Sequence, residues 1–356
     1  MTSASAYRAA ERYIRSREFF GMKLGLDNIT GFLDSIGNPQ QQYPTVHISG
    51  TNGKGSTVAM LATVLQQAGY KTGQFTSPHL VDLKERIRVD GRKVRTSSVT
   101  AFVRKHRKEL TRRKLSFFEV VTAMALDYFA RAGVDIAVVE TGLGGRLDAT
   151  NVLNPTLTIT TEISLDHVEI LGRSVRKIAN EKAGIIKAGV PHLVGLLSAD
   201  AARVFSKVCS ERQAPLHSLK TEETVVHDDA RRFDFKCNGF SLRAIAPTLY
   251  GSHQIHNAAL VTKASMLLNE QGFSIPAKAV KNGIGATRWP GRFQIVRRRN
   301  HPTMIFDVAH NTGCVGAFVE SFCRMYPDRK AVVLTGFVQR KEHQLMFDVL
   351  SSITSE

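Results

Sequence analysis

The chain has 356 residues, 43% of them hydrophobic and 22% charged, a globular composition that excludes a mainly disordered protein and suggests two domains. Its formal net charge of +17 favours anionic partners without saying which. The four cysteines form no CxxC pair, so we interpret them as buried or inert thiols of a reducing compartment. Because we find neither a secretory h-region nor an apolar run of about 20 residues, we expect a cytoplasmic protein without a membrane span.

The N-terminal part predicts the start of a parallel α/β sheet. Helical periodicity covers residues 5–20 and 29–36, and a β-rich run at 45–49 then enters a glycine-rich turn. A helix over 56–68 follows, and residues 71–76 form the next expected strand. Strand, loop, helix and strand in this order are typical of a parallel α/β sheet.

The same alternation continues through the middle of the chain. Helices are expected over 98–113, 117–132 and 175–186, and strands over 135–140, 156–161 and 191–197. The strand at 135–140 is nearly all apolar, as expected where helices cover both faces of a sheet. Residues 220–245 interrupt the pattern and predict a small antiparallel excursion, after which a helix over 255–268 resumes it.

Residues 288–291, with adjacent proline and glycine, predict a linker to a second α/β domain. Strands are expected there at 294–296, 303–306 and 330–334. We therefore predict an α/β protein with a P-loop-type, mostly parallel ATPase domain at 1–287. A smaller Rossmann-like domain at 288–356 has few elements, and we expect it to be truncated.

The strongest chemical motif lies between the first strand and its helix. It consists of Gly50, Thr51, Asn52, Gly53, Lys54, Gly55 and Ser56. Glycines let backbone N–H groups approach phosphate oxygens, the helix N-terminus adds its dipole, and Lys54 adds a positive charge. The match to GxxxxGK[ST] is imperfect, because Ile48 stands at the first glycine position and Gly55 follows the lysine.

Other polar residues stand where strands of such a sheet end. Glu140 ends an apolar strand, a place where many P-loop enzymes hold a magnesium ligand. His167 follows the strand at 156–161, and Asp307 and His310 follow one in the second domain, with Arg292 nearby. Taken singly, His167 fits a structural role at least as well as metal binding. Lys182 likewise fits a solvated helix position at least as well as a place in the site.

Eight motifs in the same order carry a resemblance to a known family. They read GTNGKGST, TSPHL, VVETGLGGRLDATN, LDH, EKAGIIK, SHQIHNAA, RWPGRF and FDVAHN. Together they resemble the folylpolyglutamate synthase and dihydrofolate synthase family of the Mur ligase group, over residues 23–336. Residues 337–342 depart from the acidic, lysine-bearing stretch common in that family, and family chains usually continue for several more strands and helices.

The resemblance implies a role for each matching residue. Lys54 and its loop would hold the ATP phosphates, and Asn257, Arg292 and Asp307 would also contact ATP. Ser77 and Glu140 would bind a first Mg²⁺, and His167 a second. Lys182 would be carbamylated, so that its carbamate becomes an anionic metal ligand, and His310 would lie near the phosphates.

The resemblance further implies an ATP-dependent amide ligase that adds L-glutamate to dihydropteroate or to a reduced folate through an acyl phosphate. Glutamate would bind between the domains, and a monovalent cation is a further cofactor to expect beside ATP and two Mg²⁺ ions. We expect a monomer with small-molecule substrates and neither nucleic-acid nor membrane partners.

Three other interpretations remain open. A cell-wall Mur ligase shares this chemistry but carries a substrate domain before the loop, where this chain has 49 residues. A P-loop ATPase that binds nucleic acid would explain the net charge but not the TSPHL and EKAGIIK motifs. An inactive paralogue kept for binding would explain a shortened second domain.

Overall fold

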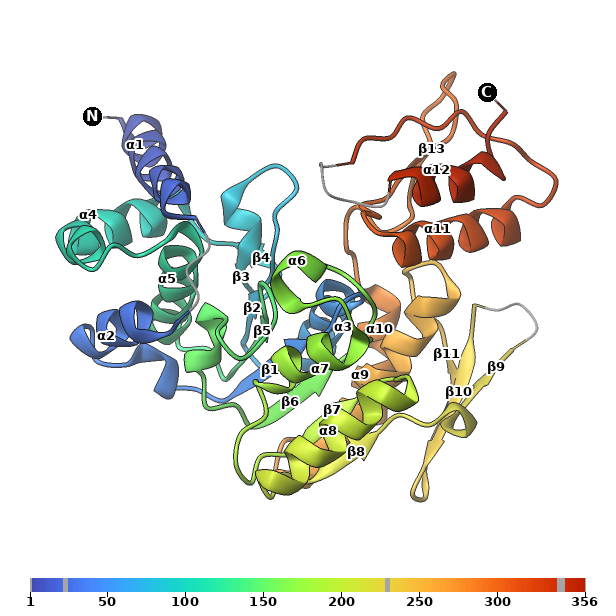
Figure 1. Ribbon diagram of the computed structural model, residues 1–356, viewed down its shortest axis with the longest axis horizontal. Coiled ribbons are helices and arrows are strands. Elements are labelled where there is room, and N and C mark those ends of the chain that lie inside the picture. The colour runs from blue at the N-terminus through green and yellow to red at the C-terminus, as the bar shows by residue number, and fades with distance from the viewer. Residues whose placement is uncertain (1, 22–24, 228–230, 338–342, 356) are drawn as a thin grey trace.

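The computed structural model describes residues 2–21, 25–227, 231–337 and 343–355, so most of the unusual stretch at 337–342 lies outside the described residues. A large sheet lies at the centre of the molecule, with helices on both sides of it (Figure 1). The C-terminal segment forms a separate, smaller unit at the upper right of that view, above α9 and α10.

The sheet has eight strands in the order β4-β3-β2-β5-β1-β6-β7-β8. In chain order they are β1 (Thr45–Ser49), β2 (Thr72–Phe75), β3 (Ile87–Val89), β4 (Arg92–Lys93), β5 (Ile136–Glu140), β6 (Leu157–Thr160), β7 (His192–Val194) and β8 (Leu216–Ser218). Only β3 and β4 run antiparallel to their neighbours, at one edge. The predicted α/β class with a mostly parallel sheet is therefore confirmed.

The central strands bring their carboxyl ends to one edge of the sheet. In β1, Ile48 pairs with Glu140 of β5, and Ser49 pairs with Thr160 of β6, all in parallel register. Every residue of these three strands is buried. The segments that leave this edge begin at Gly50, Thr141 and Thr161, and they provide the floor of the candidate site.

Helices cover both faces of the sheet, which explains the apolar strands. One face packs against α1 (Ser3–Ser16), α2 (Asp27–Ser35), α4 (Thr96–Arg112) and α5 (Phe117–Ala132). The opposite face packs against α3 (Lys54–Gln67), α9 (Ser252–Glu270) and α10 (Ala277–Ala286). Val138 and Val139 of β5 are both fully buried because they point into these two different cores.

Shorter elements complete the large domain. Helix α7 (Val175–Ala183) packs with α8 (Ala199–Glu211) beside β7, and α6 (Val168–Leu171) precedes them. The 3₁₀ turns are η1 (Arg17–Phe20), η2 (Pro39–Gln41), η3 (Leu83–Arg86), η4 (Ala149–Val152) and η5 (Thr221–Glu223). The helix expected over 5–20 therefore becomes α1 followed by η1.

The antiparallel excursion predicted for residues 220–245 is present. It consists of β9 (Thr224–Val226), β10 (Phe233–Cys237) and β11 (Phe240–Ile245). Phe233 and Phe235 are fully buried against the core of the large domain. A buried ion pair of 2.6 Å between Lys263 of α9 and Glu223 joins this small sheet to the large domain.

The C-terminal unit contains β12 (Gln294–Val296), β13 (Met304–Phe306), α11 (Thr312–Met325) and α12 (His343–Ser351). The two strands form an antiparallel hairpin. The strand expected at 330–334 is wrong: this segment makes one isolated bridge, from Ala331 to Thr354, and leaves Val332 and Leu334 exposed. An apolar β-branched run becomes a strand only where a neighbouring backbone pairs with it, and none does along this segment as described.

The domain boundary at 287/288 stays a prediction, although it falls directly after α10. No helix among the described residues is long and apolar enough to span a bilayer. The cysteines are less uniform than predicted: Cys209 and Cys237 are buried, Cys323 is exposed, and Cys314 lies at the candidate site.

Candidate active site

The phosphate loop leaves β1 and turns directly into α3. Gly50 and Gly53 adopt positive φ angles of 144° and 84°, a region that disfavours side chains. A Cβ on Gly50 would lie 1.9 Å from the Thr161 hydroxyl oxygen, so only glycine fits there. Helix α3 begins at Lys54, two residues earlier than expected, which brings its N-terminus up to the loop.

Residues after β6 hold the loop from one side. The Thr161 hydroxyl donates a 2.6 Å hydrogen bond to the Asn52 carbonyl oxygen, and the Thr51 N–H donates one of 2.6 Å to the Glu162 carbonyl oxygen. The Thr51 hydroxyl donates to the Ser164 carbonyl oxygen over 3.1 Å. The loop is thus held in shape by the protein itself.

Two lysines meet at the first residue of the loop. The Lys54 ammonium donates hydrogen bonds of 3.0 Å to the carbonyl oxygens of Gly50 and Thr51. The Lys182 ammonium, from α7, donates one of 2.6 Å to the Gly50 carbonyl oxygen. Burial, aided by the charge of Lys54, lowers the pKa of Lys182 to about 7, so much of this amine is uncharged near neutral pH.

Glu140 lies beside the loop at the end of β5. Its carboxylate accepts a 3.0 Å hydrogen bond from the Ser77 backbone N–H. Burial raises the pKa of Glu140, and the nearby Lys54 opposes that shift. A buried carboxylate next to a serine and a phosphate-binding loop fits a hard divalent cation such as Mg²⁺.

The described residues contain no cluster of three or more His, Cys, Asp or Glu side chains able to hold a metal. The predicted ligand set includes a serine hydroxyl and a lysine carbamate, which are not among those types. The uncharged amine is the form that reacts with CO₂, and burial makes it available near neutral pH by lowering the pKa of Lys182 to about 7, so its environment fits the predicted modification.

Helix α9 supports the loop from the other side. The Gln254 side-chain amide donates to the Ser56 hydroxyl over 3.3 Å, and that of Asn257 donates to the Gln254 carbonyl oxygen over 3.1 Å. The Asn257 amide oxygen lies 2.6 Å from where a Cβ on Gly53 would stand. Asn257 therefore lies against the loop, as its predicted nucleotide contact requires.

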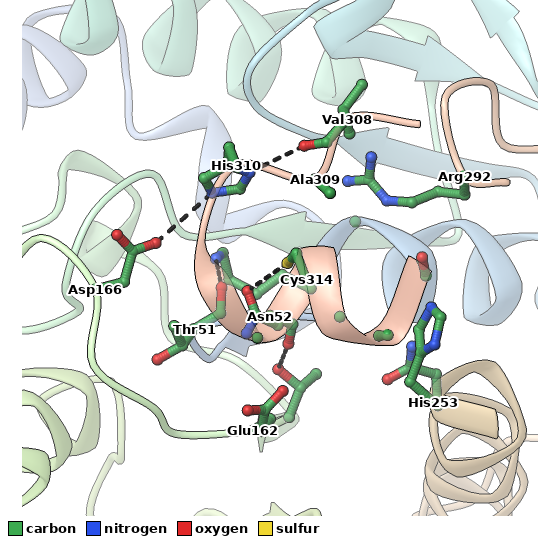
Figure 2. A pocket seen from close by; sticks show the side chains of 18 of the residues that line it. Thr51, Asn52, Glu162, Asp166, His253, Arg292, Val308, Ala309, His310 and Cys314 are labelled. Atoms are coloured by element: carbon green, nitrogen blue, oxygen red, sulfur yellow. Dashed lines mark hydrogen bonds and ion pairs between the residues drawn. The ribbon is translucent and has the colours of Figure 1, made fainter. Parts of the chain in front are cut away.

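The β12–β13 hairpin carries the predicted residues of the second domain. The Asp307 carboxylate accepts hydrogen bonds of 2.7 and 2.8 Å from the N–H groups of Phe293 and Ala309. Figure 2 shows His310 between the Val308 carbonyl oxygen, 3.0 Å from Nδ1, and Asp166, whose Oδ2 lies 3.6 Å from Nε2. The Arg292 guanidinium lies on the same side of the site, near Ala309.

The second domain touches the phosphate loop through the start of α11. The Asn311 side-chain amide donates to the Asn52 side-chain oxygen over 3.0 Å and to Asp166 Oδ2 over 3.2 Å. The Cys314 thiol also donates to the Asn52 side-chain oxygen, over 3.0 Å (Figure 2). The domains therefore meet directly at the loop.

Two cavities join at this meeting point. The first, of about 330 Å³, is lined by every predicted site residue except Gly50, whose carbonyl oxygen holds the two lysines. The second, of about 950 Å³, is mainly apolar and includes Phe117, Phe118 and Trp289 in its wall. Glu140, His167 and His310 line both cavities and mark their junction.

Sequence reasoning did not assign a role to several residues of the site. Asp166 and Asn311 lie inside the LDH and FDVAHN motifs, next to the histidines, and Cys314 is predicted to be a buried or inert thiol. Arg86, which donates a 2.8 Å hydrogen bond to Nδ1 of His79 at the second cavity, was also missed. Asp166, Asn311 and Cys314 lie in or just after motifs, which is the signal available from sequence, but the contacts that join them to one another or to Asn52 span long stretches of sequence. Arg86 stands outside every motif.

Comparison with known proteins agrees with this geometry. Residues 48–265 match the Mur ligase middle domain. The dihydrofolate synthase/folylpolyglutamate synthase of Bacillus subtilis is 36% identical over 98% of this chain and 84% of its own length. Folylpolyglutamate synthase of Mycobacterium tuberculosis complexed with ADP superposes with a TM-score of 0.90 at 30% identity, covering all of this chain and 82% of that one.

A complex of folylpolyglutamate synthase with AMPPCP and folate superposes with a TM-score of 0.89 at 29% identity, over 98% of this chain and 87% of that one. The fold and the phosphate loop define an ATP-dependent ligase of the Mur type. Within that class, the chain belongs to the folylpolyglutamate synthase and dihydrofolate synthase family.

Proposed function

We propose that this ligase joins the amine of L-glutamate to a carboxylate of dihydropteroate or of a folate that already carries glutamate. The proposal rests mainly on one observation, the junction of the two cavities. A nucleotide cavity and a larger aromatic cavity meet at Glu140, His167 and His310, where phosphate and carboxylate would react.

The first cavity suits ATP. Its floor is the phosphate loop, with backbone N–H groups at the start of α3 and the charges of Lys54 and Arg292. Relatives of the same fold bind ADP and AMPPCP, which supports this use of the cavity. We propose that Asn257 and Asp307 contact the nucleotide, with His310 near its phosphates.

The second cavity suits a flat aromatic acid. The ring centroids of Phe118 and Phe75 are 6.0 Å apart. The Arg86 guanidinium carbon lies over the Phe117 ring, 5.2 Å from its centroid. Asp148, a buried carboxylate that accepts hydrogen bonds from the N–H groups of Leu143 and Thr150, also lines this cavity. The relative complexed with folate supports this assignment.

The reaction we propose has two steps. A carboxylate oxygen of the folate attacks the γ-phosphorus of ATP, the bond to ADP breaks, and an acyl phosphate forms. The glutamate amine then attacks the acyl carbon, loses a proton, and inorganic phosphate leaves with the bonding electrons. Lys54 and Arg292 offset the negative charge of the first step, while contact between the domains excludes water from the acyl phosphate.

We propose that Ser77, Glu140, His167 and carbamylated Lys182 hold two Mg²⁺ ions. When bound, these ions would neutralise phosphate charge and orient the γ-phosphoryl group. Glutamate would bind at the contact between the domains, where Arg292 and His310 lie beside the cavity junction. This position would place its amine next to the acyl carbon.

A phosphate-release assay tests the function. Dihydropteroate and tetrahydrofolate are supplied in parallel, each with ATP, Mg²⁺ and glutamate, and Lys54→Ala is the control. We expect release that needs both a folate and glutamate and is lost in the variant. Release stimulated instead by DNA or RNA would overturn the proposal. Folate labelled with ¹⁸O in its carboxylate should pass one ¹⁸O atom to phosphate, and unlabelled phosphate would exclude the acyl phosphate.

A further inference from the structure

One side chain joins three segments that are remote in sequence. Asn311 lies at the start of α11, and its side chain is almost fully buried, with 8% of the residue exposed. Its oxygen accepts a 2.9 Å hydrogen bond from the Cys314 N–H and so caps the helix. Its amide donates to Asn52 of the phosphate loop and to Asp166.

Asp166 receives more than this one contact. Its Oδ2 also lies 3.6 Å from Nε2 of His310, and its Oδ1 accepts a 2.8 Å hydrogen bond from the His167 N–H. The same carboxylate oxygen therefore faces both His310 and the neighbouring Asn311. Because Asp166 belongs to the large domain, the place of His310 in the cleft depends on a group outside its own domain (Figure 2).

We infer that Asn311 is a positioning residue: it ties the second domain to the phosphate loop and to Asp166, and thereby sets His310 at the cavity junction. The inference rests on the proposed function, since it concerns how that same site is assembled. A helix cap alone requires only the Asn311 oxygen. The two amide contacts across the domains are additional, and they end on the loop that would hold ATP.

Substitutions at Asn311 can separate its role as a helix cap from its two amide contacts across the domains. Asn, Asp and Ser cap helices about equally well, so Asn311→Ser and Asn311→Asp keep the cap and lose the amide donor. In Asn311→Asp the new carboxylate also faces Asp166, and the two negative charges repel. In the double variant with Asp166→Asn, the new amide at position 166 can donate to the new carboxylate at position 311. The hydrogen bond is then restored with donor and acceptor exchanged. Ser198→Ala, which removes the side-chain cap of α8 in the large domain, is the matched control for a lost cap.

The expected result is a loss of kcat that follows the two amide contacts. Asn311→Asp should lower kcat roughly ten- to a hundredfold, the effect of losing a buried hydrogen bond to a charged group, and should melt below the wild type because its carboxylate faces Asp166. Asn311→Ser introduces no charge and should melt close to the wild type. The loss of kcat should be smaller in Asn311→Ser than in Asn311→Asp, and the double variant should recover part of the kcat that Asn311→Asp loses. Ser198→Ala should keep the wild-type kcat. Wild-type kcat in Asn311→Asp, or a double variant that is worse than both single variants, would overturn the inference.

A second measurement does not depend on turnover. Trp289 is the only tryptophan of the chain, and it lies at the second cavity, 3.2 Å from where a Cβ on Gly55 would stand. Its emission should shift to the red in Asn311→Asp and respond less to AMPPCP than in the wild type. If wild type and Ser198→Ala turn over no folate, the proposed function fails while this measurement still decides the inference. An unchanged emission response in Asn311→Asp would contradict it.

Discussion

The Lys182 ammonium donates a 2.6 Å hydrogen bond to the carbonyl oxygen of Gly50, the residue that opens the phosphate loop. A buried lysine from α7 thus lies within reach of the atoms that would surround the ATP phosphates. Because burial lowers the pKa of this lysine to about 7, its uncharged form is available near neutral pH. That combination supports its proposed conversion to a carbamate.

Carbamylation makes activity depend on CO₂ and on pH. A carbamate signal from Lys182 should appear in ¹³C NMR spectra after addition of ¹³C-bicarbonate. Activity should fall below about pH 7, because the protonated amine cannot take up CO₂. Lys182→Ala should lower kcat at least about tenfold, the effect of losing even an outer-shell metal partner.

Lys187→Ala is the matched control, because Lys187 follows the same helix but donates its hydrogen bond to the Asn151 carbonyl oxygen, away from the phosphate loop. It should keep both the ¹³C signal and the rate. Full activity in rigorously CO₂-free buffer would contradict the carbamate.

The shape of the phosphate loop can be tested by adding one methyl group. Gly50→Ala would place a Cβ against the Thr161 hydroxyl and displace a hydrogen bond that holds Asn52. We expect a loss of about 1–3 kcal/mol in the free energy of unfolding and weaker AMPPCP binding by calorimetry.

Gly316→Ala, in α11, meets no atom within 4 Å and is the control. It should leave nucleotide affinity unchanged and stabilise the helix by about 0.5–1 kcal/mol. Equal AMPPCP affinity in both variants would show that Gly50 does not shape the nucleotide site.

Because two cavities hold the two substrates, a substitution in one cavity should change the KM for only one substrate. Phe118→Ala removes an aromatic ring from the second cavity only, so the KM for folate should rise about tenfold while the KM for ATP stays constant. Steady-state kinetics with each substrate varied in turn provides the measurement. Phe347→Ala, on the half-exposed α12, should change neither KM. A Phe118→Ala variant with a raised KM for ATP alone would reverse the assignment of the cavities.

A buried histidine predicts how stability responds to acid. His192 is fully buried, stacks on Phe205, and has its pKa lowered by burial to about 3. Between that value and the ordinary value of 6.5 the unfolded chain binds the proton and the folded chain does not, so stability falls as pH falls. From pH 7 to pH 5 this one group should cost about 2 kcal/mol.

Denaturant unfolding at both pH values measures the effect. His192→Gln should lose that part of the pH dependence, whereas His301→Gln, at an exposed turn, should keep it. An identical pH dependence in wild type and His192→Gln would contradict the burial argument.

Much of the fold could be predicted because its strands carry a simple signal. Strands buried on both faces, such as β1 and β5, appear as short apolar runs between helical patterns. Residues 330–334 carry a similar signal but lack a paired neighbour along their length, and pairing is a property of the fold rather than of the run. Edge strands β3 and β4 are too short to show a period.

The candidate site was predictable only in part for a related reason. Local motifs identified the loop, Glu140, Lys182 and His310, because each stands at a strand or helix end with a recognisable neighbour. The contacts of Asn311 with Asn52 and Asp166 span 259 and 145 residues of sequence. Such contacts depend on how two domains meet, and a single sequence carries no period or spacing that records this.

The most direct test of the central claim is the mass of the folate product. The purified chain is incubated with ATP, Mg²⁺, L-glutamate and either dihydropteroate or tetrahydrofolate, and the folates are analysed by mass spectrometry beside a Lys54→Ala control. We expect a product heavier by one or more glutamyl residues, formed by the wild type and absent from the control. Hydrolysis of ATP with both folates recovered at their original mass would contradict the assignment of this chain as a folate–glutamate ligase.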